Sequence, residues 1–113
     1  MGLSSDGILI WGIAYDDEDF QFEYDYEKDE ELSERHPGIE FGIHCSYDYP
    51  MRYVAPSDFV VRAYRGTPRS CQELFFALER GDQDAWRDQL HAAVLDAGLE
   101  WREPELTLIS VLG

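Results

Sequence analysis

The chain has 113 residues, enough for one domain with a modest core, and its 44% hydrophobic and 14% aromatic content is that of a folded protein. Its formal net charge at pH 7 is -15, so it repels nucleic acids and anionic membranes and attracts basic partners. These values exclude wholesale disorder and disfavour direct binding to DNA, RNA or a membrane.

The negative charge is concentrated in the N-terminal half. Residues 1–50 hold fourteen acidic and two basic residues, whereas residues 51–113 hold ten and seven. The chain has two cysteines and no recognisable secretory signal, and its longest apolar run, Ile8–Tyr15, is far too short for a membrane span. These features predict a soluble cytoplasmic protein with reduced thiols. No repeat or linker indicates a second domain, so we expect one domain over residues 1–113.

The first two predicted elements are strands of different kinds. Residues Gly7–Tyr15 are almost continuously apolar, which is typical of a central strand buried on both faces. Residues 19–27 alternate between aromatic and polar side chains, and this period of two indicates a half-buried strand. Carboxylates two residues apart on its solvent face would lie roughly 6.6–6.8 Å from each other. The aromatic positions are Phe20, Phe22, Tyr24 and Tyr26, and the polar positions are Asp19, Gln21, Glu23, Asp25 and Glu27.

The middle of the chain predicts a short helix or loop followed by several strands. Residues Glu27–Arg35 are good helix formers and favour an acidic helix or a loop, which Pro37-Gly38 ends. Turn signals separate three predicted strands, which are Ile39–Tyr47, Met51–Ala55 and Asp58–Tyr64. Asp48-Tyr49-Pro50 is the first turn, and Pro56-Ser57 is expected to join the other two strands in a hairpin.

The C-terminal third predicts two helices. Residues Ser70–Arg80 favour a short helix that Gly81 ends. The next helix begins at an N-cap, Asp82 or Asp84, and ends before Gly98, which suits a left-handed C-terminal residue. Its apolar stripe consists of Trp86, Leu90, Ala93, Val94 and Ala97.

A final apolar strand covers Glu105–Leu112. The predicted elements are mostly strands in the first part of the chain, followed by two helices and a final strand. This order indicates an α+β fold. We expect an antiparallel sheet of about four to six strands with one or two helices packed on one face.

The acidic stretch between Asp16 and Glu34 contains eleven carboxylates against a single Lys28, and it is the main candidate site. A rigid row of carboxylates resembles a strand of phosphates, because Lys and Arg bind both groups. Two other interpretations stay open. The stretch could be a solvent-facing edge whose charge prevents strand pairing, or it could bind a divalent cation, although it lacks the glycine of a calcium loop. The positions expected to contact a partner are Asp16, Asp17, Asp19, Glu23, Asp25, Glu27, Glu30 and Glu31.

No pattern in the chain predicts an enzyme, a metal site or a cofactor. His44 and Cys45 are adjacent and so point to opposite faces of a strand, and a catalytic set with Asp48 lacks an identifiable orienting group. The sequence does not tell whether Cys45 and Cys71 are close in space, and no glycine-rich nucleotide-binding loop is present. A small basic cluster either holds an anion or pairs with surplus carboxylates, and its members are Arg62, Arg65 and Arg69.

Several short motifs resemble those of small phage and prophage proteins of uncharacterised function. They are the run His44-Cys45-Ser46-Tyr47-Asp48-Tyr49-Pro50-Met51, the turn Arg65-Gly66-Thr67-Pro68, and the opening Leu3-Ser4-Ser5-Asp6-Gly7-Ile8-Leu9 before an acidic insertion. In size and charge the chain is also similar to the anti-CRISPR proteins of phages, several of which imitate DNA. The resemblance implies a phage protein in the cytoplasm of a bacterial host, and it brings no catalytic motif.

The sequence therefore leads to the hypothesis of a non-enzymatic inhibitor without a cofactor. Its acidic stretch would occupy the nucleic-acid-binding surface of a basic protein, with CRISPR effectors as the expected class. The alternative is a phage structural or accessory protein whose acidity only serves solubility and whose contact surface is apolar, around Trp101. Either protein would be a monomer or a homodimer.

Overall fold

The computed structural model describes residues 5–15, 26–46, 49–64 and 66–112, and it contains a five-stranded sheet. The described residues also form three α-helices and one 3-10 turn, η1. The predicted α+β fold with an antiparallel sheet is confirmed. In chain order the elements are β1 (Ser5–Ala14), α1 (Tyr26–Arg35), β2 (Ile39–Ser46), β3 (Tyr49–Pro56), η1 (Ser57–Phe59), β4 (Val60–Ala63), α2 (Gln72–Arg80), α3 (Gln83–Asp96) and β5 (Glu105–Leu112).

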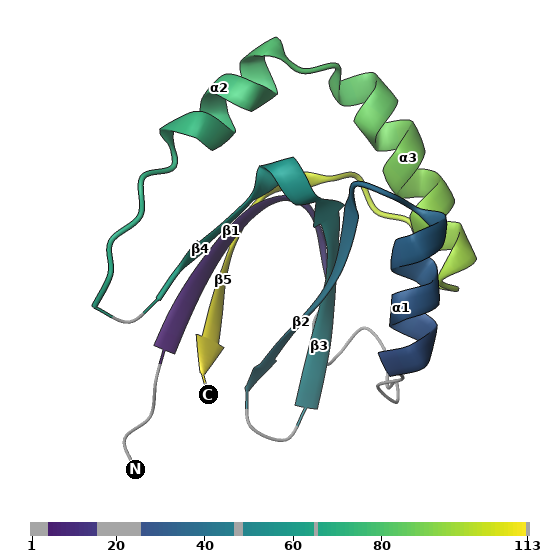
Figure 1. Ribbon diagram of the computed structural model, residues 1–113, viewed down its shortest axis with the longest axis horizontal. Coiled ribbons are helices and arrows are strands. Elements are labelled where there is room, and N and C mark those ends of the chain that lie inside the picture. The colour runs from purple at the N-terminus through teal and green to yellow at the C-terminus, as the bar shows by residue number, and fades with distance from the viewer. Residues whose placement is uncertain (1–4, 16–25, 47–48, 65, 113) are drawn as a thin grey trace.

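β1 is the central strand and has partners along both edges. On one edge β5 pairs antiparallel with residues 5–12. On the other edge β4 pairs with residues 7–10 and β3 with residues 13–14, so two successive strands follow the same edge. β2 pairs with β3, and one parallel pair, Ser46 with Leu112, connects β2 to β5. These pairings close a circuit, and the sheet is bent into an arch (Figure 1).

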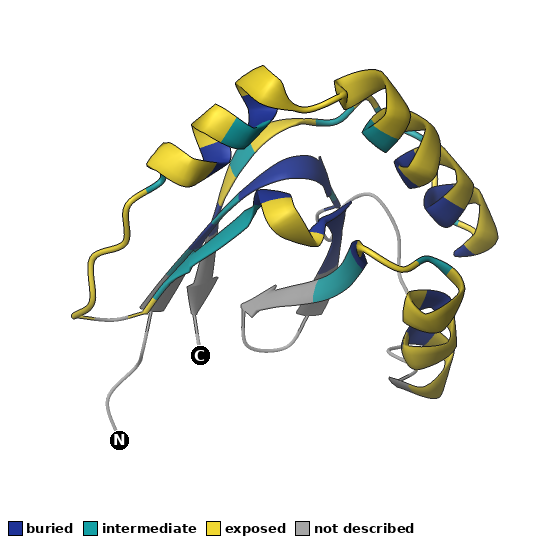
Figure 2. Cartoon of the chain, turned by 45° about the horizontal axis from the view of Figure 1, so that its top comes forward, coloured by how far each residue is buried: buried dark blue, intermediate teal, exposed yellow. Residues whose placement is uncertain are grey.

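The arch buries apolar side chains on both of its faces. Trp11 and Ile13 of β1 belong to an outer cluster that includes residues of α2 and α3, whereas Ile8 and Ile10 belong to an inner cluster. Figure 2 shows that the helices over the sheet are exposed along most of their outer surface and buried at a few positions. The prediction of a central strand buried on both faces is confirmed. The outer cluster contains Trp11, Ile13, Tyr15, Ile39, Val54, Phe59, Leu74, Leu78, Leu90, Ala93 and Val94, and the inner cluster contains Ile8, Ile10, Tyr53, Ala55 and Ile109.

Gly12 lies where β1 passes from β4 to β3. A Cβ atom at this position would be 2.5 Å from the carbonyl oxygen of Val54 and 2.6 Å from the Cβ of Ala55. Glycine is therefore needed for the close approach of the two backbones. This approach allows β1 to change its strand partner and the sheet to bend.

The predicted hairpin around Pro56-Ser57 is wrong. β3 and β4 run one after the other along β1, joined by η1, and each pairs with β1 rather than with the other. Tight hairpin turns need residues that accept a positive φ. Pro56 has a φ of -61°, and no glycine follows it before β4, so the chain continues forward instead of reversing.

Other predicted boundaries also change. Tyr26 and Glu27, expected at the end of an alternating strand, begin α1, and acidic residues in the first turn favour a helix there. The rest of that predicted strand, residues 19–25, lies outside the described residues. Tyr49 and Pro50, expected in a turn, already belong to β3.

The predicted helices are confirmed. Residues 27–35, for which the sequence allows a helix or a loop, are helical as part of α1. Asp82 is the N-cap of α3 and accepts a hydrogen bond from the backbone N–H of Ala85 at 3.1 Å. Gly98 follows the helix with a φ of +74°, as its position predicts. None of the helices in the described part of the chain is long and apolar enough to cross a membrane.

Candidate partner-binding surface

Three of the eight predicted contact residues lie in the described part of the chain, and all three are exposed on α1. They are Glu27, Glu30 and Glu31. The other five lie outside the described residues, and they are Asp16, Asp17, Asp19, Glu23 and Asp25. α1 adds a fourth exposed carboxylate, Glu34, which the sequence prediction omits. Glu34 follows Glu27, Glu30 and Glu31 at helical spacing, so a prediction that assumed a helix here would have included it.

These four glutamates form a stripe along one side of α1, which we call the acidic stripe. Their spacing from Glu27 is i, i+3, i+4 and i+7, and an α-helix places such positions on the same side. Asp29 and Leu32 of the same helix are buried, so the stripe lies on the side away from the protein. At 1.5 Å per residue it spans about 10.5 Å, or about 3.5 Å of helix axis per carboxylate.

Most of the charge in the acidic stripe is not neutralised within the described structure. Glu31 lies 4.0 Å from Arg35 in an exposed i, i+4 pair, and such pairs contribute little. No ion pair joins Glu27, Glu30 or Glu34 to another residue in the described part of the chain. The stripe therefore presents carboxylates that a cationic partner can reach without first breaking an internal pair.

A buried ion pair anchors the opposite side of α1. Asp29 of α1 accepts a hydrogen bond from Arg52 of β3, and both side chains are almost fully buried. Leu32, one turn further along, is completely buried. The sequence prediction missed this role of Asp29, although the spacing of Asp29, Leu32 and His36 indicates one inward-facing side of a helix.

The C-terminal end of α1 is tied to α3. Arg35 Nε donates to Asp96 Oδ2 at 2.9 Å, and His36 Nε2 lies 2.8 Å from the same oxygen. The hydrogen bonds from Arg35 and then from His36 lower the pKa of Asp96 from its ordinary value of 3.8, and the bond to Asp96 raises the pKa of Arg35. Asp96 is therefore ionised at neutral pH, and the contact links the C-terminal ends of α1 and α3 at the surface.

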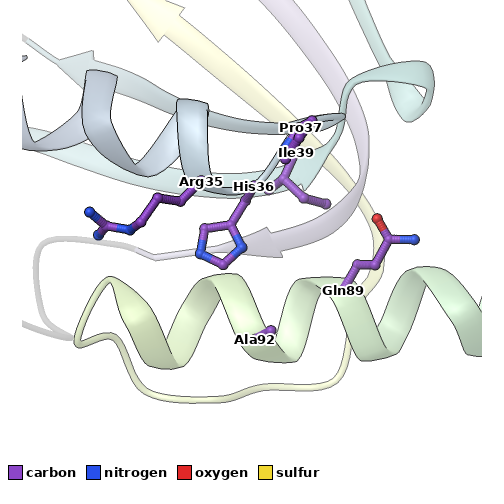
Figure 3. A pocket seen from close by; sticks show the side chains of 6 residues that line it. All are labelled: Arg35, His36, Pro37, Ile39, Gln89 and Ala92. Carbon is purple, nitrogen blue, oxygen red and sulfur yellow. The ribbon is translucent and has the colours of Figure 1, made fainter.

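A small pocket lies beside this contact, between α3 and the turn that follows α1 (Figure 3). Its volume is about 210 Å³, below the roughly 300–1,000 Å³ of typical ligand pockets. No serine, cysteine or carboxylate lines it, so it offers no pair of nucleophile and base. It is lined by Arg35, His36, Pro37, Ile39, Gln89 and Ala92.

A polar network lies inside the arch. The Tyr53 hydroxyl donates to Glu40 Oε2 at 2.6 Å, and Arg62 donates to the same oxygen at 2.8 Å and to the Tyr53 hydroxyl. Burial, and then the hydrogen bond to Glu40, raise the pKa of Tyr53 above its ordinary value of 10. Arg62 thus pairs internally, which is one of the two roles predicted for the arginine cluster. Arg69 is exposed, and Arg65 lies outside the described residues.

The other candidate residues do not converge on a site. Cys71 is a partly buried free thiol at the start of α2, and the described residues contain no group of three or more His, Cys, Asp or Glu that could hold a metal ion. The side chains of His44 and Cys45 lie outside what the structure describes. Trp101 is partly buried against the core, with its ring centroid 4.8 Å from that of His91.

Comparison of the chain with protein-family models, with curated proteins and with solved structures finds no match. The likeness to phage proteins and to anti-CRISPR proteins stays a prediction. The functional argument rests on the residues and on their geometry.

Proposed function

We propose that this protein is a non-enzymatic inhibitor that occupies the nucleic-acid groove of a basic protein. The observation that carries the proposal is the acidic stripe, four exposed glutamates on one side of a helix whose other side is held by a buried ion pair. Five further predicted contact residues precede α1 in the sequence and lie outside the described residues.

The acidic stripe matches the charge density of one nucleic acid strand. Its carboxylates follow one another at uneven axial steps of about 4.5, 1.5 and 4.5 Å, with a mean of about 3.5 Å, and the phosphates of one strand of B-DNA follow one another at about 3.4 Å. Arginine binds carboxylates and phosphates alike with paired hydrogen bonds, and lysine binds both as a point charge. Four carboxylates replace about four phosphates, so the stripe would form one part of a larger interface.

The anchoring of α1 favours a binding role over a purely solubilising one. A ten-residue helix is marginal in water by itself, and here Asp29, Leu32 and Arg35 attach it to the rest of the protein. A charge that only serves solubility does not need a fixed geometry. A fixed helix loses less conformational entropy on binding, which favours a tight complex.

The partner that fits the stripe is a protein whose basic groove normally holds nucleic acid. The phage-like motifs, together with the size and charge typical of anti-CRISPR proteins, support a CRISPR effector in the bacterial cytoplasm as the partner class. A net charge of -15 would also speed the encounter with such a groove.

The experiment compares two triple variants that change the net charge equally at different places. One carries lysine at three positions of the stripe, and the control carries lysine at three exposed acidic positions of α2 and α3. The stripe variant is Glu27→Lys, Glu30→Lys and Glu34→Lys, and the control is Glu79→Lys, Asp84→Lys and Asp88→Lys. Both are measured against a panel of purified, guide-loaded CRISPR effectors, with duplex DNA as competitor.

We expect the wild-type protein to bind an effector, to be displaced by duplex DNA, and to bind less tightly as salt rises from about 50 to 200 mM. The stripe variant should lose binding, and the control variant should keep most of it. Equal losses in the two variants would show that only net charge matters, and binding that ignores both salt and DNA would refute mimicry.

Exposed apolar side chains favour a second candidate, a structural or accessory protein whose acidity only serves solubility. Phe75 and Phe76 of α2 are both exposed, and aromatic side chains are common anchors of protein interfaces. In that case the stripe variant would bind its partner normally. Replacing both phenylalanines by serine would then abolish a binding that DNA does not compete.

A further inference from the structure

Within the described residues, β5 is paired along one edge and open over most of the other. One edge pairs with β1, whereas on the other edge the described residues provide a single partner pair, Ser46 with Leu112. The outer edge of residues 105–110 therefore has no strand partner in the described part of the chain. Such an edge is a template on which another strand can pair.

β5 also lacks the features that usually keep strand edges apart. Natural edge strands are often short, or carry charged residues or proline. β4, for which the described residues provide β1 as the one partner strand, is four residues long and carries Arg62. Residues 106–112 of β5 contain no charged residue and no proline.

An apolar row crosses the sheet and ends at this edge. Val61 of β4 lies opposite Leu9 of β1, and Leu9 lies opposite Leu108 of β5. Leu108 is 77% exposed and Leu106 is 45% exposed. A further strand with apolar side chains at the matching positions would continue the row and remove these leucines from water.

We propose that β5 pairs antiparallel with β5 of a second copy of this chain, about a two-fold axis at Thr107. In this register Leu106 of one copy lies opposite Leu108 of the other, and the symmetry repeats the contact. The two Thr107 residues lie opposite each other. Apolar pairs and threonine pairs are both favourable across strands, and a two-fold interface uses the same patch on each copy.

The one charged residue of β5 does not oppose a second copy at this edge. Glu105 is the only charged residue of β5, and the register places it opposite Ile109. The two Glu105 residues are then separated by about 13–14 Å along the strands, more than the roughly 8 Å Debye length at physiological salt. The acidic stripe lies on α1, beside the other arm of the arch (Figure 1), so a basic partner and a second copy would bind at different places.

The salt dependence separates this proposal from the proposed function, on which it does not rest. Each copy carries a net charge of -15, so added salt screens the repulsion between copies and should tighten the dimer. Binding of the acidic stripe to a basic groove should weaken under the same change.

Analytical ultracentrifugation tests the dimer at about 1 to 200 µM protein and at about 50 and 500 mM NaCl. We expect a monomer–dimer equilibrium that shifts toward the dimer at the higher salt. Leu108→Lys should raise the dissociation constant by about tenfold or more, because it places a charge in the apolar row. The control is Leu95→Lys on α3, where the leucine is 59% exposed, and it should behave as the wild type.

The register is tested by combining Leu106→Glu with Leu108→Lys. In the proposed register this double variant places opposite charges across the interface twice, so it should dimerise more tightly than Leu108→Lys alone. Thermal unfolding shows whether each variant is folded. A wild-type protein that is monomeric throughout, equal effects of Leu108→Lys and Leu95→Lys, or a double variant no better than the single one would overturn the proposal.

Discussion

Arg52→Met tests the ion pair that anchors α1. The side chains of Arg52 and Asp29 are 8% and 11% exposed, so this pair is nearly removed from water. Methionine has a similar length and no charge, and it would leave the buried Asp29 carboxylate beside an apolar chain. Removing one member of a buried pair costs about 3–5 kcal/mol. A domain has a total stability of about 5–15 kcal/mol, so the variant should lose a large part of its free energy of unfolding.

The loss is measured by urea denaturation followed by far-UV circular dichroism. With a slope of about 1–3 kcal/mol per molar urea, the midpoint should fall by roughly 1–5 M. The matched control is Arg87→Met, because Arg87 is 45% exposed and pairs with Glu103 at 3.0 Å on the surface. Exposed pairs contribute about 0–1 kcal/mol, so Arg52→Met should cost clearly more than Arg87→Met.

A second substitution separates the buried charge from the lost packing. Adding Asp29→Leu to Arg52→Met removes the charge and should recover most of the stability, because apolar side chains often replace a buried pair without loss. If Arg52→Met costs no more than Arg87→Met, the pair does not anchor α1. The argument from a preorganised acidic stripe would then lose its main support.

Three other predictions concern pH and packing. The contact with Arg35 lowers the pKa of Asp96. It therefore stabilises the protein fully above about pH 4, and this stabilisation is lost as the pH falls through the folded-state pKa. The difference in unfolding free energy between wild type and Asp96→Asn should therefore shrink below about pH 4 in acid titrations. The raised pKa of Tyr53 contributes stability that is present below about pH 10 and is lost above it, so Tyr53→Phe should flatten the alkaline decline of the melting temperature. Gly12→Ala should cost about 1–3 kcal/mol through the clash with the backbone of β3, whereas Gly7→Ala, where a Cβ meets nothing within 4 Å, should change the urea midpoint little. Equal midpoints for the two alanine variants would contradict the close approach at Gly12.

Local patterns in the sequence predict the elements better than their pairing. β1, β5 and both C-terminal helices follow from apolar runs, caps and the helical period, which depend on neighbouring residues. The path of β3 and β4 along β1 depends on contacts between distant segments, and the Pro56-Ser57 signal favours the wrong connection. Gly12 within an apolar strand is a local sign of a close backbone approach, and it could have indicated the bend.

The candidate surface is predicted in composition but not in geometry. The alternation of residues 19–27 runs into the first residues of α1, Tyr26 and Glu27, so a period of two hides the helical period of the glutamates that follow. The partners of the anchoring residues could not be predicted, because Arg52 lies 23 positions from Asp29 and Asp96 lies 61 positions from Arg35. Only the fold brings these partners together.

The pairing of β1 with β5 constrains how the protein folds during synthesis. β1 leaves the ribosome well before β5, and the other described strands are made between them, yet β5 pairs with residues 5–12 of β1. Until β5 is made, an apolar strand lacks its partner on one edge, and such unpaired edges promote aggregation of folding intermediates. Closing a loop of about 100 residues also slows folding, because its entropy is lost before the strand contacts form. Chaperones that hold nascent chains should therefore increase the yield of this protein more than that of a helical protein of equal length.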